Sequence, residues 1–381
     1  MDDLSKLRVS VDARYLKRTG IGVPKYIRGL LDELILAGAN LTLITDDHAH
    51  ATQLAAEFPR CASVALPARS GFLWEQVRLP WHLCREAYDL HLAGGNYGLP
   101  LVRDGRTALV LVVHDIIPLR FPRAYLAPRP AWAVKYILST VISVLGAEHI
   151  VAVSEHTRSD LGRYFRRRAV SVVYPEIPTP IESTEDIRLE LPPRYFAYCG
   201  GYEWRKNFDT LLDAFALLLR ETDTDAHLVV LGRGYDETFP IVTRLGIEER
   251  TTFLGYVPEE TKNAVLASAS ALVYPSRYEG FGLPILEGLS AGVPVVCGTG
   301  SSLDEAGGQA VIRVDALNYR SLAEGMYRAI SGDQAALSAA GYAQLEKLRA
   351  ERVVMGFPRI VAEVVAGRRQ RQRRWMARTR D

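Results

Sequence analysis

Residues 276–287 run Ser-Arg-Tyr-Glu-Gly-Phe-Gly-Leu-Pro-Ile-Leu-Glu and directly follow the apolar run Ala271–Tyr274. A short apolar run of this kind predicts a buried parallel strand. Pro284 is typical of the first turn of a helix, so Gly280 and Gly282 are predicted in the connecting loop, where they let the backbone turn sharply. A strand, a loop and a helix in this order are typical of an open α/β sheet, whose ligands bind at the carboxyl ends of the strands.

This segment holds two carboxylates, Glu279, which is predicted in the loop, and Glu287, which is predicted in the first turn of the helix. At the carboxyl end of a strand they can hold two hydroxyl-rich parts of one ligand. For a pair of acids without other context, a role in capping the helix N-terminus is the alternative.

Short apolar runs alternate with helical patterns through most of the 381 residues, which predicts parallel sheets covered by helices. The predicted strands are Val9–Val11, Leu41–Ile44, Ala62–Leu66, Leu90–Ala93, Ala108–Val113, Ile150–Val153, Tyr195–Cys199, His227–Leu231, Thr251–Leu254, Ala271–Tyr274 and Pro294–Cys297. The predicted helices include Pro24–Ala37, Trp74–Glu86, Ala131–Leu145 and nearly all of the chain from Asn318 onward.

The alternation breaks at Pro175–Pro193, which holds five prolines and several carboxylates without clear periodicity. This composition indicates a linker. The chain is also longer than one hydrophobic core usually supports. We therefore predict an N-terminal Rossmann-like domain over residues 1–178, a C-terminal Rossmann-like domain over 179–356, and a last helix with a basic tail over 357–381.

A second candidate site, residues 200–207, follows the first strand of the second half and has the sequence Gly-Gly-Tyr-Glu-Trp-Arg-Lys-Asn. Arg205 offers bidentate hydrogen bonds and Lys206 a compact charge, so the pair suits a diphosphate. Asn207 is expected to be the N-cap of the next helix. A solvated Arg–Lys pair is the usual alternative on an arbitrary surface, but the position directly after a strand favours a site.

The first half offers two further candidates at predicted strand ends. Gly20 and Gly22 precede a helix with Pro24 near its start, where backbone N–H groups can approach an anion. A turn that needs positive φ explains these glycines equally well. His114 lies where the run Ala108–Val113 ends, and it is either a site residue or a buried histidine with satisfied hydrogen bonds.

Taken together, these motifs resemble the large retaining glycosyltransferase family 4, and the likeness covers nearly the whole chain. The segment from Glu279 to Glu287 looks like the E-x7-E motif of that family and continues as Gly-Leu-Ser-Ala-Gly-Val-Pro-Val-Val at 288–296. Residues 205–207 resemble its diphosphate-binding segment, and residues 19–22, Thr-Gly-Ile-Gly, its N-terminal glycine loop.

The resemblance implies the GT-B fold, in which two Rossmann-like parallel-sheet domains face a central cleft. In such proteins the C-terminal helix often crosses back to the N-terminal domain. The chain departs from the family pattern at Asp304, where proline is usual, and at residues 174–177, Tyr-Pro-Glu-Ile, where many relatives carry a different turn. Both departures lie outside the motifs of the expected donor site.

The resemblance also implies roles for individual side chains. Arg205 and Lys206 are expected to neutralise the donor diphosphate and the charge that grows on it as it leaves. Glu279 and His114 are expected to contact the transferred sugar, and Glu287 the ribose hydroxyls. The catalytic set is therefore Arg205, Lys206, Glu279 and His114, and the donor-binding set is Gly20, Gly22, Gly201, Gly280, Phe281, Gly282, Leu283 and Glu287.

A chain with this resemblance is expected to be a retaining, metal-independent hexosyltransferase. The implied reaction is a front-face substitution in which the departing phosphate helps to deprotonate the acceptor, so no protein nucleophile is assigned. Similarity to bacterial capsule and O-antigen mannosyltransferases favours GDP-mannose as donor and a glycan or polyprenyl-diphosphate-linked saccharide as acceptor. The alternatives are a UDP-sugar donor, a non-hydrolysing sugar-nucleotide epimerase, and a non-catalytic sugar-binding protein of periplasmic type.

No catalytic metal and no cofactor is expected. Residues 223–225, Asp-Thr-Asp, have the D-x-D pattern by which other glycosyltransferases hold a divalent ion. They precede a predicted strand, at the sheet edge opposite the expected ligand, so we interpret them as a solvated loop. The four cysteines are far apart and form no CxxC, which is typical of reduced, mostly buried thiols.

The formal net charge of +2 hides a basic C-terminus. Its arginines are Arg368, Arg369, Arg371, Arg373, Arg374, Arg378 and Arg380. With Trp375 they can lie on an anionic membrane, and a disordered, solvated tail is the alternative. No nucleic-acid partner is expected, because no recognised binding module accompanies the charge. The polar start and the lack of a long apolar run predict a cytoplasmic protein. The basic C-terminus and the family resemblance favour a peripheral position at the inner face of the plasma membrane.

Overall fold

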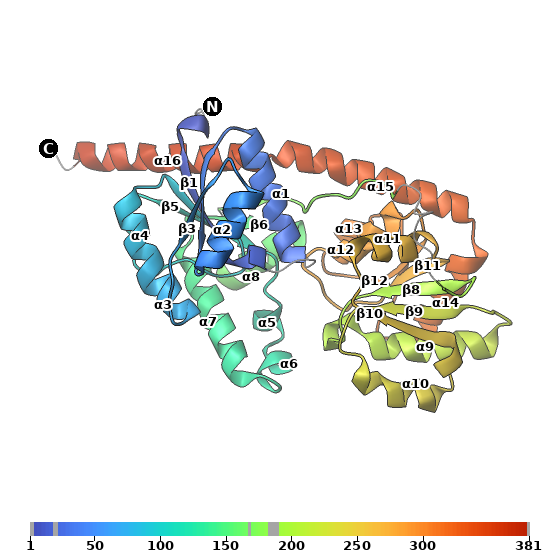
Figure 1. The fold of residues 1–381 in the computed structure, drawn as a ribbon. Helices are drawn as coiled ribbons and strands as arrows, with labels where there is room; N and C mark the ends of the chain where they lie inside the picture. Colours follow the sequence, from blue (N-terminus) through green and yellow to red (C-terminus); the bar gives the residue numbers. More distant parts are fainter. Residues whose placement is uncertain (1–3, 18–21, 167–168, 182–189, 379–381) are drawn as a thin grey trace. The chain divides into compact units, whose positions relative to one another are not determined.

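The computed structural model describes all residues except 1–3, 18–21, 167–168, 182–189 and 379–381. The chain forms two compact units (Figure 1). The first unit comprises Met1–Glu176 and Arg352–Asp381, and the second comprises Ile177–Glu351.

The described part of the first unit contains a seven-stranded sheet in the order β3-β2-β1-β4-β5-β6-β7, in which every pairing is parallel. Its strands are β1 (Arg8–Asp12), β2 (Asn40–Thr45), β3 (Ala62–Ala65), β4 (Leu90–Ala93), β5 (Ala108–Val113), β6 (His149–Ala152) and β7 (Val170–Val172). In the register of the centre, Val11 lies opposite Leu43 on one side and Leu92 on the other. β4 and β5 are buried along their whole length, because helices cover both faces.

Helices of the first unit follow the strand ends closely. They are α1 (Gly22–Leu36), α2 (His48–Glu57), α3 (Gly71–Leu73), a π-helical turn (Trp74–Arg78), α4 (Leu79–Glu86), α5 (Ile117–Arg120), α6 (Pro122–Leu126), α7 (Pro130–Gly146) and α8 (Glu155–Phe165). Side-chain caps fix the starts of α2, α3 and α8: Asp47 accepts a hydrogen bond from the Ala49 N–H at 2.8 Å, Ser70 accepts one from the Leu73 N–H at 3.2 Å, and Ser154 accepts one from the Thr157 N–H at 3.0 Å.

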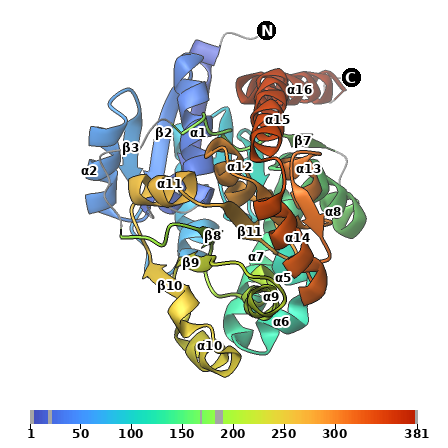
Figure 2. The ribbon, with the colours of Figure 1, turned by 90° about the vertical axis from the view of Figure 1, so that its right-hand side faces the viewer.

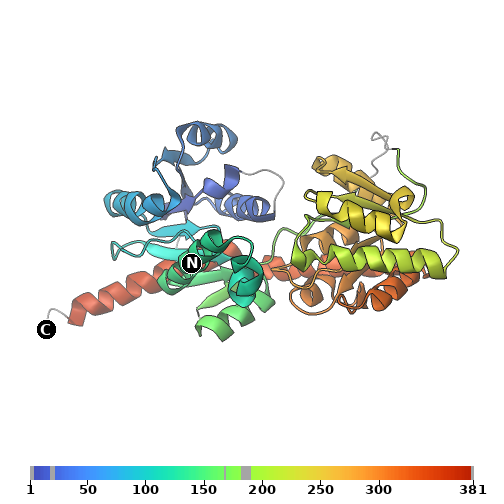
Figure 3. The ribbon, with the colours of Figure 1, turned by 90° about the horizontal axis from the view of Figure 1, so that it is seen from below.

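The last helix, α16 (Phe357–Arg378), also belongs to the first unit, although it follows the second unit in sequence. It contacts α1 and β5, and Phe357 is fully buried. Figures 1 and 3 show it running along this unit. Arg368 and Arg371 form ion pairs with Glu148, so the basic segment is an ordered helix up to Arg378 and not a disordered tail.

The described part of the second unit contains a six-stranded parallel sheet in the order β10-β9-β8-β11-β12-β13. Its strands are β8 (Tyr195–Cys199), β9 (His227–Leu231), β10 (Thr251–Gly255), β11 (Ala271–Tyr274), β12 (Val295–Gly298) and β13 (Ile312–Val314). β8 and β11 lie side by side in the middle, with Leu272 opposite Ala197, so their carboxyl ends are neighbours.

Helices cover both faces of this second sheet. They are α9 (Phe208–Glu221), α10 (Phe239–Leu245), α11 (Glu259–Ala267), α12 (Leu283–Ser290), α13 (Leu303–Gly307), α14 (Tyr319–Ser331) and α15 (Gln334–Met355). α9 and α14 pack together over one face, where Phe215 and Met326 share a core with Val273 of β11 (Figure 2). α12 packs on the other face: a Cβ at Gly288 would lie 2.7 Å from Leu272, so a larger residue there would push the helix off the sheet.

The predicted fold class is confirmed, with two parallel-sheet Rossmann-like units. Every strand expected from the apolar runs is present. Two strands were not predicted, β7 and β13. The expected helix Trp74–Glu86 starts as a π-helical turn and continues as α4. Among the described residues, no helix is long and apolar enough to cross a membrane.

Candidate active site

Glu279 is the centre of a buried cluster at the carboxyl ends of β8 and β11. Its Oε1 accepts hydrogen bonds from the Nζ of Lys206 at 2.7 Å, the hydroxyl of Tyr274 at 2.6 Å and the hydroxyl of Ser276 at 2.8 Å. Its Oε2 lies 2.6 Å from Nη1 of Arg205. The two cations predicted for the diphosphate and the first glutamate of the motif therefore meet in one place.

The charges of this cluster stabilise one another. Burial by itself would raise the pKa of Glu279, but Lys206 and Arg205 outweigh it and lower the pKa to about 2. Burial lowers the pKa of Lys206, and Glu279 opposes that shift. With Lys206 protonated, two cations face two carboxylates, the buried Glu279 and the more exposed Glu203, whose Oε2 lies 2.9 Å from Nε of Arg205. Two cations at the carboxyl end of a strand suit an anionic ligand.

Three strand-end loops converge on this cluster. The carbonyl oxygen of Arg205, after β8, accepts from the Arg277 N–H at 2.7 Å. After β12, the hydroxyl of Ser302 donates to the Glu279 carbonyl at 2.9 Å, and the hydroxyl of Ser301 accepts from the Glu279 N–H at 3.3 Å. The backbone of the loop that carries Glu279 is thus held by the loops after β8 and β12, the strands on either side of β11.

The loop between β11 and α12 turns where the glycines were predicted to allow it. Gly282 has φ +101° and occupies the N-cap position of α12, and a Cβ there would lie 3.2 Å from Leu303. Phe281 beside it is buried, and Gly280 and Leu283 are half-buried. Gly201, in the loop after β8, is half-buried as well.

Glu287 lies in the second turn of α12, not in the first as predicted, because the helix begins at Leu283. Its Oε1 lies 2.7 Å from Nζ of Lys262 in α11. Burial lowers the pKa of Lys262, but Glu287 outweighs it, so the pKa is raised. Sequence reasoning missed Lys262, because one lysine in a helix that begins with two acids is typical of a solvated face.

Asn207 was predicted to cap α9 with its side chain, and this is wrong. It occupies the N-cap position with φ +59°, but its Oδ1 accepts from Nε of Arg277 at 2.9 Å and its Nδ2 donates to the Ala316 carbonyl. The side chain therefore ties the loop after β8 to the loops after β11 and β13. A left-handed backbone directs it away from the helix N–H groups.

In the first unit, His114 follows the carboxyl end of β5. Its Nε2 lies 2.9 Å from the Gly94 carbonyl, and its backbone N–H donates to Oδ1 of Asn96 at 2.6 Å. Burial lowers the pKa of His114 to about 4, so the ring is neutral at pH 7. A carbonyl only accepts, so the ring proton is on Nε2 and Nδ1 is left as an acceptor. Gly22 begins α1, and Gly20 lies outside the described residues.

A second charged cluster of the first unit was not predicted from the sequence. Asp12, at the end of β1, accepts from Nε of Arg14 at 2.9 Å and from Nη2 at 2.7 Å. Glu75 accepts from the same guanidinium at 3.1 Å, and the ring of Trp74 lies 3.7 Å from its central carbon. Arg14 and Glu75 are 61 positions apart in the chain, so no local sequence pattern indicates that they are in contact.

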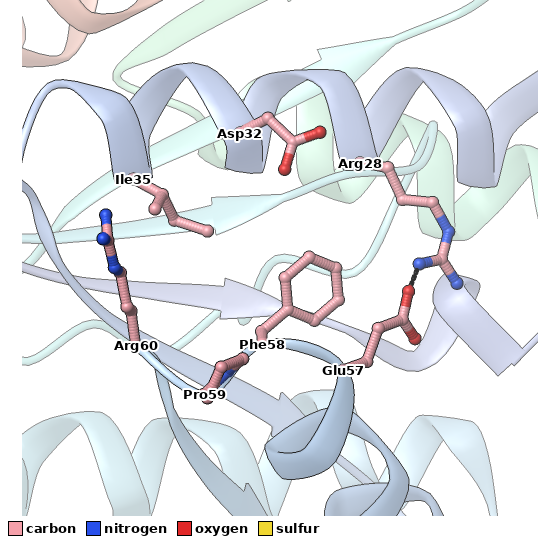
Figure 4. Close-up of a pocket in the computed structure, with 7 residues that line it drawn as sticks. All are labelled: Arg28, Asp32, Ile35, Glu57, Phe58, Pro59 and Arg60. Carbon is pink, nitrogen blue, oxygen red and sulfur yellow. Dashed lines mark ion pairs between the residues drawn. The ribbon is translucent and has the colours of Figure 1, made fainter.

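Other features lie apart from these clusters. A surface cavity of about 410 Å³ is lined by Arg28, Asp32, Ile35, Glu57, Phe58, Pro59 and Arg60, none of which was predicted for the site (Figure 4). Asp223 and Asp225 lie in the loop before β9, at the amino ends of the strands, the sheet edge that was predicted for them. Asp225 forms an ion pair with Arg194 at 3.0 Å. The described residues include no group of three or more acids, histidines or cysteines arranged to hold a metal ion.

Known proteins resemble this chain throughout. The family model "Glycosyltransferase Family 4" matches residues 21–179, and "Glycosyl transferases group 1" matches residues 182–345. O-antigen chain mannosyltransferase B of Escherichia coli is 32% identical over 269 residues, which are 67% of this chain and 69% of that protein. O-antigen chain mannosyltransferase RfbU of Salmonella typhimurium is 24% identical over 205 residues, or 53% and 54% of the two chains. The structure of Anabaena HepE with UDP-glucose aligns with a TM-score of 0.69 at 19% identity, covering 95% and 100%.

Proposed function

Since this chain belongs to the family 4 retaining glycosyltransferases of the GT-B fold, we propose that it transfers mannose from GDP-mannose to a glycan or polyprenyl-diphosphate-linked saccharide. The enzyme class, a hexosyltransferase, follows from the family. The donor and the acceptor are the proposed part. The proposed place of action is the cytoplasm, at the inner face of the plasma membrane.

The observation that carries the proposal is the cluster of Arg205, Lys206 and Glu279. Two adjacent cations after β8 can bind both phosphates of a nucleotide diphosphate sugar. As the bond to the sugar breaks, charge develops on the phosphate, and cations already held in place stabilise it without rearrangement. Glu279 holds Arg205 and Lys206 at 2.6 and 2.7 Å, so they are positioned before the donor arrives.

In the proposed reaction the protein supplies positioning and charge, not a nucleophile. The acceptor oxygen forms its bond to the anomeric carbon on the face from which the diphosphate departs, and the departing phosphate takes the acceptor's proton. Neutral His114 offers Nδ1 to a hydroxyl of the transferred sugar. Glu287 accepts from ribose hydroxyls, with Lys262 holding its carboxylate at 2.7 Å.

The mannose assignment rests on the names of two relatives, both O-antigen mannosyltransferases. The alternative is a UDP-sugar donor, which the UDP-glucose complex of Anabaena HepE brings into consideration. Both donors carry the same diphosphate, so the charged cluster suits either, and direct binding measurements discriminate between them.

A ligand panel followed by turnover tests the proposal. Thermal unfolding is measured with GDP, UDP, GDP-mannose and UDP-glucose, and GDP-mannose is expected to raise Tm most, because a specific ligand stabilises the folded state by mass action. Purified polyprenyl-diphosphate-linked saccharide is then added, and mannosylated product is expected. A shift with UDP-glucose alone would contradict the donor, and epimerisation of the donor without acceptor would contradict the transferase reaction.

A further inference from the structure

Helix α7 turns large apolar side chains outward. Val134, Leu138 and Leu145 are 47%, 56% and 60% exposed, and they recur at helical spacing along one side of the helix. Trp132, near its start, is also exposed. The 17 residues of α7 contain one charge, Lys135. Helices of soluble proteins usually carry a polar outer face, so an apolar one indicates a surface that is covered in use.

A second outward stripe lies on the π-helical turn and α4. Val77 and Trp81, one helical turn apart, are both more than half exposed. Arg78 and Arg85 flank them and are exposed, and the guanidinium of Arg85 lies 4.5 Å from the ring centroid of Trp81. This stripe therefore combines an apolar surface with positive charge.

The loop after β4 joins the two stripes. Its Leu101 and Val102 are 61% and 68% exposed. The Leu101 N–H donates to Oε1 of Gln76 in the π-helical turn at 2.9 Å, and the Leu99 N–H donates to Oγ of Ser143 in α7 at 3.2 Å. These bonds hold the loop against both helices, which Figure 1 labels in the blue and green part of the first unit. We call the surface formed by Val77, Trp81, Leu101, Val102, Val134, Leu138 and Leu145 the α4–α7 face.

The charges on these elements have one prevailing sign. Arg78, Arg85, Arg103 and Lys135 are all exposed. Residues 116–147, which include α5, α6 and α7, contain no aspartate or glutamate. The acids on these elements are fewer: Glu75 is buried against Arg14, Glu86 lies 3.6 Å from Arg8, and Asp104 accepts from the Thr107 hydroxyl at 2.7 Å.

We propose that the α4–α7 face binds the surface of an anionic lipid bilayer. Exposed tryptophans next to aliphatic side chains suit the boundary between headgroups and acyl chains, and arginine and lysine around them complement anionic headgroups. The C-terminal helix is less suited to this role, because Arg368, Arg369 and Arg371 form ion pairs within the first unit. The proposal adds a binding surface to the membrane location in the proposed function, but it requires no particular donor or acceptor, so vesicle binding tests it separately from turnover.

Sedimentation with vesicles tests the proposal on the full chain. Phosphatidylcholine vesicles with and without phosphatidylglycerol serve as the probe. The double variant Trp81→Gln/Leu138→Gln is expected to bind anionic vesicles roughly tenfold more weakly or worse, because two apolar anchors are lost. Arg78→Gln/Lys135→Gln is expected to weaken binding and to reduce its dependence on salt.

Two matched controls alter exposed residues outside the α4–α7 face. Val353→Gln/Val354→Gln removes apolar side chains that are 77% and 80% exposed on α15, and Arg373→Gln/Arg374→Gln removes exposed charges on α16. Both are expected to bind like the unaltered chain. Equal binding by all variants, no binding to anionic vesicles, or loss only in the α16 variant would overturn the proposal. So would a dimer in gel filtration that Trp81→Gln/Leu138→Gln splits, since the face would then belong to a second copy. Circular dichroism and Tm verify that each variant is folded.

Discussion

Arg205 and Lys206 share one carboxylate, so each can be removed while the other still neutralises Glu279. Arg205→Ala or Lys206→Ala is expected to lower kcat/KM by roughly 100-fold, because a preorganised donor to the leaving group contributes about 3 kcal/mol. Steady-state kinetics with the full donor measures the effect. Arg194→Ala, at the opposite edge of the sheet, is the control and is expected to leave kcat/KM unchanged. Near-normal kinetics in both site variants would remove the cluster from the mechanism.

The two glutamates of the motif have different surroundings, which predicts different losses. Glu287 pairs with one lysine at 2.7 Å and retains acceptor capacity for ribose, whereas four protein groups contact Glu279. Glu287→Ala is expected to weaken binding of the free nucleoside diphosphate by about 1–3 kcal/mol. Glu279→Ala releases Arg205 and Lys206 from their position but also removes a carboxylate that competes with the diphosphate for them. These effects oppose each other, so this variant is expected to weaken binding of the free nucleotide less than Glu287→Ala does and to lower kcat/KM for the sugar donor. Equal losses of nucleotide affinity in calorimetric titration would contradict this division.

His91 makes the first unit sensitive to mild acid. It is fully buried in β4, its Nδ1 lies 2.9 Å from the Ser10 hydroxyl, and its Nε2 has no hydrogen-bond partner among the described residues. Burial lowers the pKa of His91 from 6.5 to about 4. Because the unfolded chain binds this proton more readily, stability is present above pH 6.5 and is lost as the pH falls toward 4.

The expected loss from His91 is about 2 kcal/mol in the free energy of unfolding between pH 7 and pH 5. Urea unfolding at both pH values measures it. His91→Asn keeps a polar group beside Ser10 and is expected to remove this contribution, whatever its effect on stability at pH 7. The slope falls but does not vanish, because the pKa of His114 is also lowered to about 4 and acts in the same window. Glu279 cannot account for the same window, because its pKa of about 2 places its contribution below pH 4.5. An unchanged slope in His91→Asn would contradict the assignment.

At the level of elements, the ion pairs of α16 differ in burial, and this predicts different contributions. Arg368 and Glu148 have side chains 14% and 15% exposed, and Nε of Arg368 also donates to the Arg106 carbonyl at 2.8 Å. Arg368→Ala is expected to lower the free energy of unfolding by about 1–3 kcal/mol. Arg359→Ala removes a pair on the same helix whose side chains are 67% and 62% exposed, and it is expected to cost much less because solvent screens the pair. Equal costs in urea unfolding would contradict this ranking.

Strands and helices with a long apolar or periodic pattern could be predicted from the sequence. Short edge strands and the π-helical turn could not, because they leave no such pattern. Long apolar runs such as Ala108–Val113 gave their strands directly, since burial on both faces requires such runs. β7 and β13 were missed because three residues at a sheet edge, partly exposed, leave no periodicity to detect. The π-helical turn at Trp74–Arg78 has residue types that are also common in α-helices. Its hydrogen bonds between residues five apart, in place of four, therefore cannot be predicted from composition.

The candidate site follows the same rule. Arg205, Lys206 and Glu279 could be found because each follows a predicted strand, and parallel strands bring their ends together. Lys262 could not be found, since its relevance depends on the packing of α11 beside α12. The Asp12–Arg14–Glu75 cluster also depends on which elements are neighbours in space. The order of the strands in the sheet determines this, and it was not predicted from the sequence.

For the whole molecule we predict turnover without a divalent metal. Two cations next to a strand edge replace the charge that an ion would bring to the diphosphate. Activity of the purified enzyme is expected to be the same, within about twofold, before and after dialysis against EDTA. The rate with the full donor and acceptor measures this. Loss of activity that Mg²⁺ or Mn²⁺ restores would contradict the prediction and direct attention to Asp223 and Asp225.

The return of α16 to the first unit constrains how the protein is made. Residues 1–176 leave the ribosome first, yet the surface that receives Phe357 and Val361 stays uncovered until the last helix emerges. At the usual speed of about 5–20 residues per second, the nascent chain waits on the order of ten seconds or more for that helix. The second unit, continuous in sequence, can finish folding during this interval. Translation order therefore makes the domain synthesised first the one completed last.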